Sequence, residues 1–185
     1  IGICVFLFPR TDEHGQQQYI KNWSQKLLRI CHITLKVTGT PETSSIMMIS
    51  NHISWLDIFV MNSVQASHFV SKDAVKSWPL IGTLCAKAGT IFISREQIKE
   101  LRMVREEMVR QLKLGGRVAF FPEGTTASQG TILPFHGSLF SAAIDAGVPV
   151  QPYALRYVHP EGSFHEAVEF VGETTIVQSI MMIAR

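Results

Sequence analysis

The chain has 185 residues, of which 46% are hydrophobic and 17% charged, and its formal net charge is +2. This length fits one domain with a substantial core, and so small a net charge, without a Lys/Arg stripe interleaved with aromatic residues, argues against nucleic-acid binding. The low charged fraction is compatible with a protein that rests against lipid, and equally with an ordinary domain that has a large core.

The cysteines and histidines predict no disulfide framework and no metal site. Cys4, Cys31 and Cys85 are odd in number and far apart, so a reducing compartment is expected. The seven histidines form no His-Glu-x-x-His motif and no Cys/His cluster at ligand spacing. A bound catalytic metal is therefore not indicated.

The N-terminal region has two parts with different patterns. Residues 1–8 are almost all apolar but are far fewer than the roughly 20 residues that span a bilayer. We expect them to end a longer anchor, with a mature N-terminus after signal cleavage as the alternative. Residues 19–35 have apolar positions every three or four residues, which predicts an amphipathic helix. That helix either packs on the core or lies on an anionic membrane surface.

Short apolar runs alternate with helical patterns through the rest of the chain. The predicted strands cover residues 46–49, 68–71, 90–93, 117–121 and 150–155, and the predicted helices cover residues 56–61, 79–88, 96–114 and 137–146. This alternation predicts an α/β fold: a single domain with a mainly parallel central sheet flanked by helices. Beyond Tyr157 we predict only a weak strand at residues 168–171.

Four chemically useful side chains follow the ends of predicted strands: His52, Lys72, Arg95 and Glu123. Ligands of open α/β sheets bind at the carboxyl ends of the strands. We therefore expect these four residues to converge on one site.

The first candidate motif pairs His52 with Asp57. A neutral imidazole, with an ordinary pKa of about 6.5, accepts a proton well once a carboxylate fixes its tautomer and orientation. The turn before the predicted helix at residues 56–61 can fold His52 back onto Asp57. A buried histidine and a helix-initiating aspartate are also common in ordinary cores. Ser54 lacks the Gly-x-Ser-x-Gly context of a serine nucleophile, so we predict a structural role for it.

The second candidate motif is the turn at residues 121–126. Pro122 fixes the chain as it leaves the strand, and Gly124 lets the backbone approach a ligand, while Glu123 and Thr125 can hydrogen-bond substrate oxygens. A plain turn would use the same proline and glycine.

Two basic residues complete the set of candidates. Arg95 can bind a phosphate through both guanidinium nitrogens, although an ion pair with a nearby glutamate is the alternative. Lys72 is the weaker candidate, because a solvated lysine at a strand end is common.

Four blocks occur in an order that resembles the glycerophospholipid acyltransferases typified by bacterial 1-acylglycerol-3-phosphate acyltransferase. The resemblance covers residues 37–155, and its blocks are Asn51-His52 with Asp57, residues 89–95, residues 121–125 and residues 148–152. We accordingly divide the chain into an apolar and amphipathic membrane-associating segment, residues 1–38, and an acyltransferase domain, residues 39–185.

The resemblance implies a reaction and a role for each candidate residue. His52 would deprotonate the free hydroxyl of a lysophospholipid such as lysophosphatidic acid, and Asp57 would orient the imidazole. The alkoxide would attack an acyl thioester carried by coenzyme A or acyl carrier protein, and no further cofactor is expected. The residues expected to bind the glycerol-phosphate part are Arg95, Glu123, Gly124 and Thr125, with Lys72 as a further candidate.

The resemblance also implies a place in phospholipid biosynthesis, at the cytoplasmic face of a membrane, with the bacterial inner membrane expected. Two positions depart from the family pattern, because Thr126 and His136 stand where basic residues are frequent. A lyso-aminolipid acceptor is therefore an alternative to a phosphate-bearing one. The same residues are also compatible with a coenzyme-A-independent transacylase, a lipid hydrolase or a catalytically silent lipid-binding module.

Overall fold

A computed structural model describes residues 12–77, 81–93 and 98–183. The helices are α2 (Glu13–Ile30), α3 (Asp57–Val64), α4 (Ile81–Lys87), α5 (Ile98–Lys113), α6 (Ser141–Ala146) and α7 (Ile176–Ile183), with short 3-10 turns at Asp73–Ser77 and Glu166–Val168. The strands are β1 (Ile46–Ser50), β2 (His68–Lys72), β3 (Ile91–Ile93), β4 (Arg117–Phe120) and β5 (Val150–Tyr153).

The strands form one five-stranded sheet in the order β3-β2-β4-β1-β5. Neighbouring strands pair in parallel throughout, so the predicted α/β fold with a mainly parallel sheet is confirmed. Ile46, Met47 and Met48 of β1 are fully buried, as expected for a parallel strand covered on both faces. Pro152 lies in β5, an edge strand, where a missing backbone donor is tolerated.

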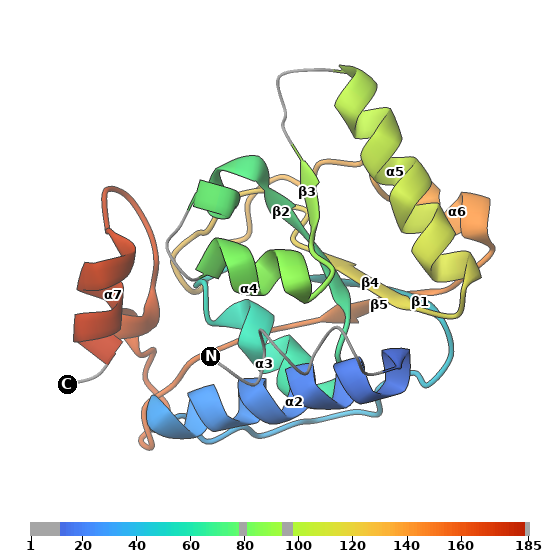
Figure 1. The fold of residues 1–185 in the computed structure, drawn as a ribbon. Coiled ribbons are helices and arrows are strands. Elements are labelled where there is room, and N and C mark those ends of the chain that lie inside the picture. The colour runs from blue at the N-terminus through green and yellow to red at the C-terminus, as the bar shows by residue number, and fades with distance from the viewer. Residues whose placement is uncertain (1–11, 78–80, 94–97, 184–185) are drawn as a thin grey trace.

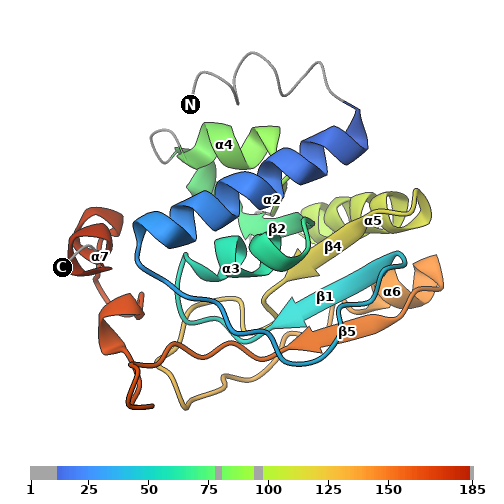
Figure 2. The same cartoon turned by 90° about the horizontal axis from the view of Figure 1, so that it is seen from below.

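Helices cover both faces of the sheet (Figure 1). On one face, Met108 and Leu112 of α5 and Ala142 of α6 pack against Met47 and Val118. On the other face, Met61 of α3 packs against Met48 and Phe69. Helix α2 crosses over α3 as an outer layer (Figure 2).

The predicted amphipathic helix exists, but its limits differ from residues 19–35. It begins at Glu13 because the Asp12 side chain caps it by accepting the backbone N–H of Gly15 at 2.9 Å. It ends at Ile30, and His32 has a left-handed backbone with φ of 54° that stops further helix. Among the described residues, no helix combines the length and the hydropathy needed to cross a bilayer. The apolar run at residues 1–8 lies outside the described residues.

The C-terminal region differs most from the sequence prediction. The strand predicted at residues 168–171 is wrong, because the backbone N–H of Phe170 donates to the carbonyl of Ile53 at 3.0 Å and not to a strand of the sheet. Helix α7 was not predicted. Helix α6 begins only at Ser141, because residues 138–140 form a turn in place of the first helical turn predicted from residue 137.

Candidate active site

His52 and Asp57 meet where β1 ends and α3 begins. The Nδ1 atom of His52 lies 2.8 Å from Oδ2 of Asp57, and the two side chains are 18% and 0% exposed, respectively. Because a carboxylate can only accept, Nδ1 is the nitrogen that carries the proton. The other ring nitrogen, Nε2, then holds the lone pair that a general base needs.

Several donors surround the Asp57 carboxylate. Its Oδ2 accepts the backbone N–H groups of Ile53 at 2.7 Å and Ser54 at 2.9 Å, in addition to the imidazole. Its Oδ1 accepts the hydroxyl of Tyr157 at 2.7 Å. Asp57 is also the first residue of α3, where the helix dipole favours a negative charge. These groups compensate the charge of a fully buried carboxylate.

The ring of His52 has a second contact, on its face. It stacks on Phe121 with the ring centroids 3.8 Å apart and the planes 5° apart, and Phe121 in turn lies against Phe69 with centroids 5.7 Å apart. Phe121 directly follows β4. Phe121, from the second motif, therefore contacts the face of the imidazole, while Asp57 contacts its Nδ1 edge.

Glu123 joins the two motifs through their backbones. Its Oε1 accepts the backbone N–H of His52 at 2.9 Å, and its Oε2 accepts the backbone N–H of Leu133 at 2.7 Å. The residue is only 3% exposed. Both oxygens are thus engaged by the protein, and the substrate contact that we predicted from the sequence stays a prediction.

A cavity of about 990 Å³ opens beside His52. Its apolar wall includes Tyr19, Trp23 and Leu27 of α2 and Ile58 and Phe59 of α3. Its polar residues include Lys72, Thr125, Thr126 and His136, and the backbone of Gly124 also lines it. An elongated apolar group and a polar group can therefore both be accommodated next to the base.

The structure brings most of the predicted site residues together. His52, Lys72, Gly124 and Thr125 line the same cavity, and Asp57 and Glu123 lie directly behind His52. Gly124 has a φ of 69°, a backbone conformation that favours glycine. Arg95 lies outside the described residues, so its predicted phosphate contact stays a prediction.

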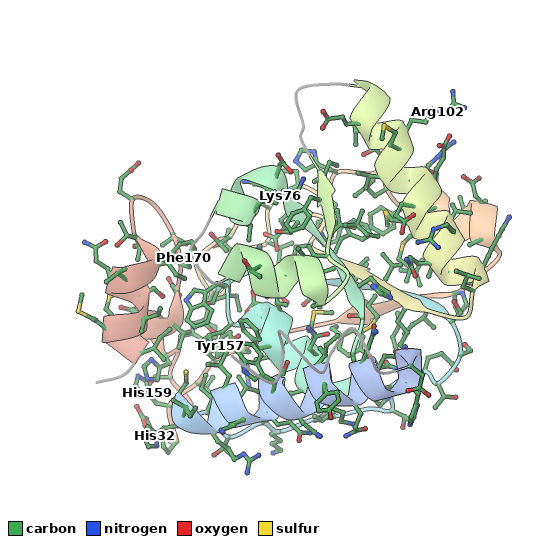
Figure 3. All side chains as sticks on the ribbon, in the orientation of Figure 1. His32, Lys76, Arg102, Tyr157, His159 and Phe170 are labelled. Carbon is green, nitrogen blue, oxygen red and sulfur yellow. The ribbon has the colours of Figure 1, made fainter. Side chains whose placement is uncertain are left out.

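Sequence reasoning missed the residues that hold the first motif from the C-terminal side. Tyr157 contacts Asp57, Phe170 contacts Ile53, and Ser179 accepts the indole N–H of Trp55 at 3.0 Å. Figure 3 shows Tyr157 near α3, with Phe170 on the side of α3 toward α7. These contacts join residues that are 100 to 124 positions apart in the sequence, and no local pattern marks them.

A family model described as acyltransferase matches residues 33–156. This segment contains His52, Asp57 and the turn at residues 121–126. The chain belongs to the acyltransferase family. The resemblance stated from the four blocks is therefore confirmed.

Curated relatives with two kinds of name are similar to this acyltransferase. The 1-acyl-sn-glycerol-3-phosphate acyltransferase of Neisseria gonorrhoeae is 41% identical over 119 residues, which are 64% of this chain and 47% of that protein. The lyso-ornithine lipid O-acyltransferase of Pseudomonas aeruginosa is 32% identical, over 92% of this chain and 65% of that protein. Its namesake from Rhodobacter capsulatus is 35% identical, over 88% and 61%. The chain thus spans about half to two thirds of these relatives.

A solved structure supports the fold of this acyltransferase. The crystal structure of the 1-acyl-sn-glycerophosphate acyltransferase PlsC from Thermotoga maritima superposes with a TM-score of 0.66, covering 80% of this chain and 63% of that chain. Its sequence identity of 22% shows a shared fold and nothing finer.

Proposed function

We propose that this acyltransferase moves an acyl chain from an acyl thioester, carried by coenzyme A or acyl carrier protein, to the free hydroxyl of a lyso-lipid. The observation that carries the proposal is that His52, paired with Asp57 at 2.8 Å, lines a cavity that has both apolar and polar residues in its wall. Family membership supports acyl transfer as the reaction type.

In the proposed mechanism His52 is the general base. Its Nε2 takes the proton of the acceptor hydroxyl while the oxygen attacks the thioester carbonyl, so that a C–O bond forms. The tetrahedral intermediate then expels the thiolate as the C–S bond breaks, and the imidazolium returns the proton to that thiolate. Asp57 stabilises the imidazolium between these two steps, and no protein nucleophile is needed.

The cavity suggests how the two substrates are arranged. The apolar wall formed by α2 and α3 suits an acyl chain, because it removes that chain from water. The polar residues Lys72, Thr125 and Thr126 suit the head group. The backbone at Gly124 can approach a ligand closely. Both groups would then meet beside Nε2 of His52.

We further propose that α2 rests on a membrane surface, at the cytoplasmic face. The helix lines the cavity with Trp23 and Leu27, so that a lipid leaving the bilayer would enter beside it. Ile30 is 65% exposed, and the nearby Lys26 and Arg29 are exposed as well. This combination suits an anionic bilayer surface.

A lyso-ornithine lipid is a second candidate acceptor, beside lysophosphatidic acid. Relatives with that name match 92% and 88% of this chain. Thr126 adds no positive charge for a phosphate, and its hydroxyl donates to the carbonyl of Phe170. The ratio of kcat/KM values for the two acceptors, measured with one acyl-CoA, decides between them. A ratio above about ten corresponds to at least 1.4 kcal/mol of discrimination.

The proposed reaction is tested by following free thiol and diacylated product together, with purified protein in detergent. His52→Ala should lower turnover by roughly 100- to 10,000-fold, whereas His159→Ala, far along the chain and outside the site, should keep it. Thiol release without lipid product would indicate a hydrolase. Acyl exchange between lipids without a thioester would indicate a transacylase. Undiminished transfer by a folded His52→Ala protein would overturn the mechanism.

A further inference from the structure

The hydroxyl of Tyr157 is part of the hydrogen-bond system around His52. It donates to Oδ1 of Asp57 at 2.7 Å, on the opposite oxygen from the one that contacts the imidazole. Tyr157 is 9% exposed, and its ring packs in a cluster with Leu28, Ile53 and Val168. The hydroxyl is therefore held in place by packing around the ring.

The backbone of Tyr157 is fixed as well. Its N–H donates to Oε1 of Gln129 at 2.7 Å, and its carbonyl accepts the N–H of His165 at 3.0 Å. The amide of Gln129 also donates to the carbonyl of His165 at 3.3 Å. A tyrosine anchored at both ring and backbone has little freedom to leave Asp57.

From this geometry we infer that Tyr157 is a positioning residue that fixes the Asp57 carboxylate and thereby holds the His52 imidazole in its orientation. The inference rests on the function proposed above. Tyr157 lies one residue beyond the segment matched by the family model. It touches Asp57 and acts on the reaction only through it.

The protonation state of Tyr157 fits this role. Burial, and then the charge and hydrogen bond of Asp57, raise the pKa of the Tyr157 hydroxyl well above its usual value. The hydroxyl thus stays protonated across the range in which a histidine titrates, and it remains a donor.

The donated hydrogen bond has two consequences for His52. It fixes the plane of the carboxylate, so that Oδ2 faces Nδ1. It also stabilises the carboxylate charge, which weakens the pull of Asp57 on the imidazolium proton. Loss of the hydroxyl should therefore impair the orientation of the imidazole and strengthen the attraction between Asp57 and the imidazolium proton.

The other charged groups near His52 are unchanged by a substitution at Tyr157. Glu123 binds the backbone N–H of His52, and Lys72 and His136 lie along the same cavity. The other titratable residues that line this cavity in the described part of the chain are Tyr19, Lys26 and Cys85. A shift in the pH profile would then report on the Tyr157–Asp57 hydrogen bond.

The test compares Tyr157→Phe with Tyr153→Phe as a matched control. The Tyr153 hydroxyl lies 3.2 Å from side-chain oxygens of Gln65 and Gln151, away from Asp57. For Tyr157→Phe we expect kcat to fall about 10- to 100-fold, which is the effect of losing a hydrogen bond to a charged group. KM should stay within about twofold of the wild-type value, because Tyr157 acts on the reaction only through Asp57. The acid limb of kcat/KM should move to higher pH. Tyr153→Phe should change neither.

A second variant covers the case in which Tyr157→Phe fails to fold. Replacing Tyr157 by 3-fluorotyrosine keeps the ring and strengthens the donor, so the acid limb should move to lower pH. An unmoved acid limb in the fluorotyrosine protein would overturn the inference, as would a folded Tyr157→Phe protein whose profile keeps its wild-type shape. Wild-type transfer that depends on His52 establishes the proposed function separately, so the two can fail independently.

Discussion

His52 and Phe121 lie ring on ring, with centroids 3.8 Å apart and planes only 5° apart. They come from the ends of β1 and β4, which are neighbours in the sheet. Parallel pairing of these strands is what brings the two motifs, some seventy residues apart, into one site. The imidazole thus has a fixed plane before any substrate binds.

Shortening Phe121 should affect turnover more than folding. Phe121→Leu keeps an apolar side chain and should cost about 1 kcal/mol of stability. Without the parallel ring the imidazole is less well oriented, and kcat should fall about tenfold, which corresponds to about 1.4 kcal/mol. Steady-state kinetics and thermal unfolding give the two effects. Phe140 contacts Phe120 on the opposite face of the sheet. Phe140→Leu should therefore lower the free energy of unfolding while leaving kcat near the wild-type value.

Replacing Glu123 by glutamine should loosen the connection between the motifs. The amide nitrogen would face a backbone N–H in place of an acceptor, and an unsatisfied buried donor costs about 1–3 kcal/mol. Both the free energy of unfolding and kcat should fall, measured by denaturant unfolding and kinetics. Glu106→Gln, in an exposed ion pair with Arg102, is the control. A raised KM for the lyso-lipid at unchanged stability would instead support the substrate contact predicted from the sequence.

Thiol labelling can test whether the acyl chain occupies the apolar part of the cavity. Cys85 lines the cavity, and burial raises the pKa of its thiol, as it also does for Cys31. Because the thiolate reacts, both should label slowly near neutral pH and faster as the pH rises. A non-hydrolysable acyl thioether of coenzyme A should protect Cys85 and leave Cys31 unchanged, as read by mass spectrometry. Equal labelling of Cys85 with and without the analogue would count against this placement.

The proposed membrane contact of α2 predicts a specific loss of vesicle binding. Ile30 and Leu114 are both 65% exposed, on α2 and after α5, respectively. Burying an isoleucine side chain in lipid contributes about 1.5–3 kcal/mol, so Ile30→Gln should weaken binding to anionic vesicles at least tenfold. Leu114→Gln should bind like wild type in the same sedimentation assay. Equal binding by both variants would contradict an orientation with α2 on the bilayer.

The strands could be predicted closely from sequence, whereas several contacts of the site could not. Ile46, Met47 and Met48 form a continuous apolar run because β1 is covered on both faces, and such runs are visible locally. The limits of α2 depend on Asp12 and His32, single residues whose effects a periodic pattern does not show. The pairing of His52 with Asp57 could be predicted because a short turn joins the two residues. The hydrogen bond that Tyr157 donates to Asp57 could not, because it depends on how distant segments pack.

The residues after the family-matched segment hold the first motif at three points, through Tyr157, Phe170 and Ser179. A shortened chain ending at Arg156 would keep every recognisable block and lose all three supports. The presence of the blocks is consequently an incomplete criterion for an active relative. A rearranged or truncated homologue should also be inspected for a tyrosine, C-terminal to the blocks, whose hydroxyl can reach the aspartate that corresponds to Asp57.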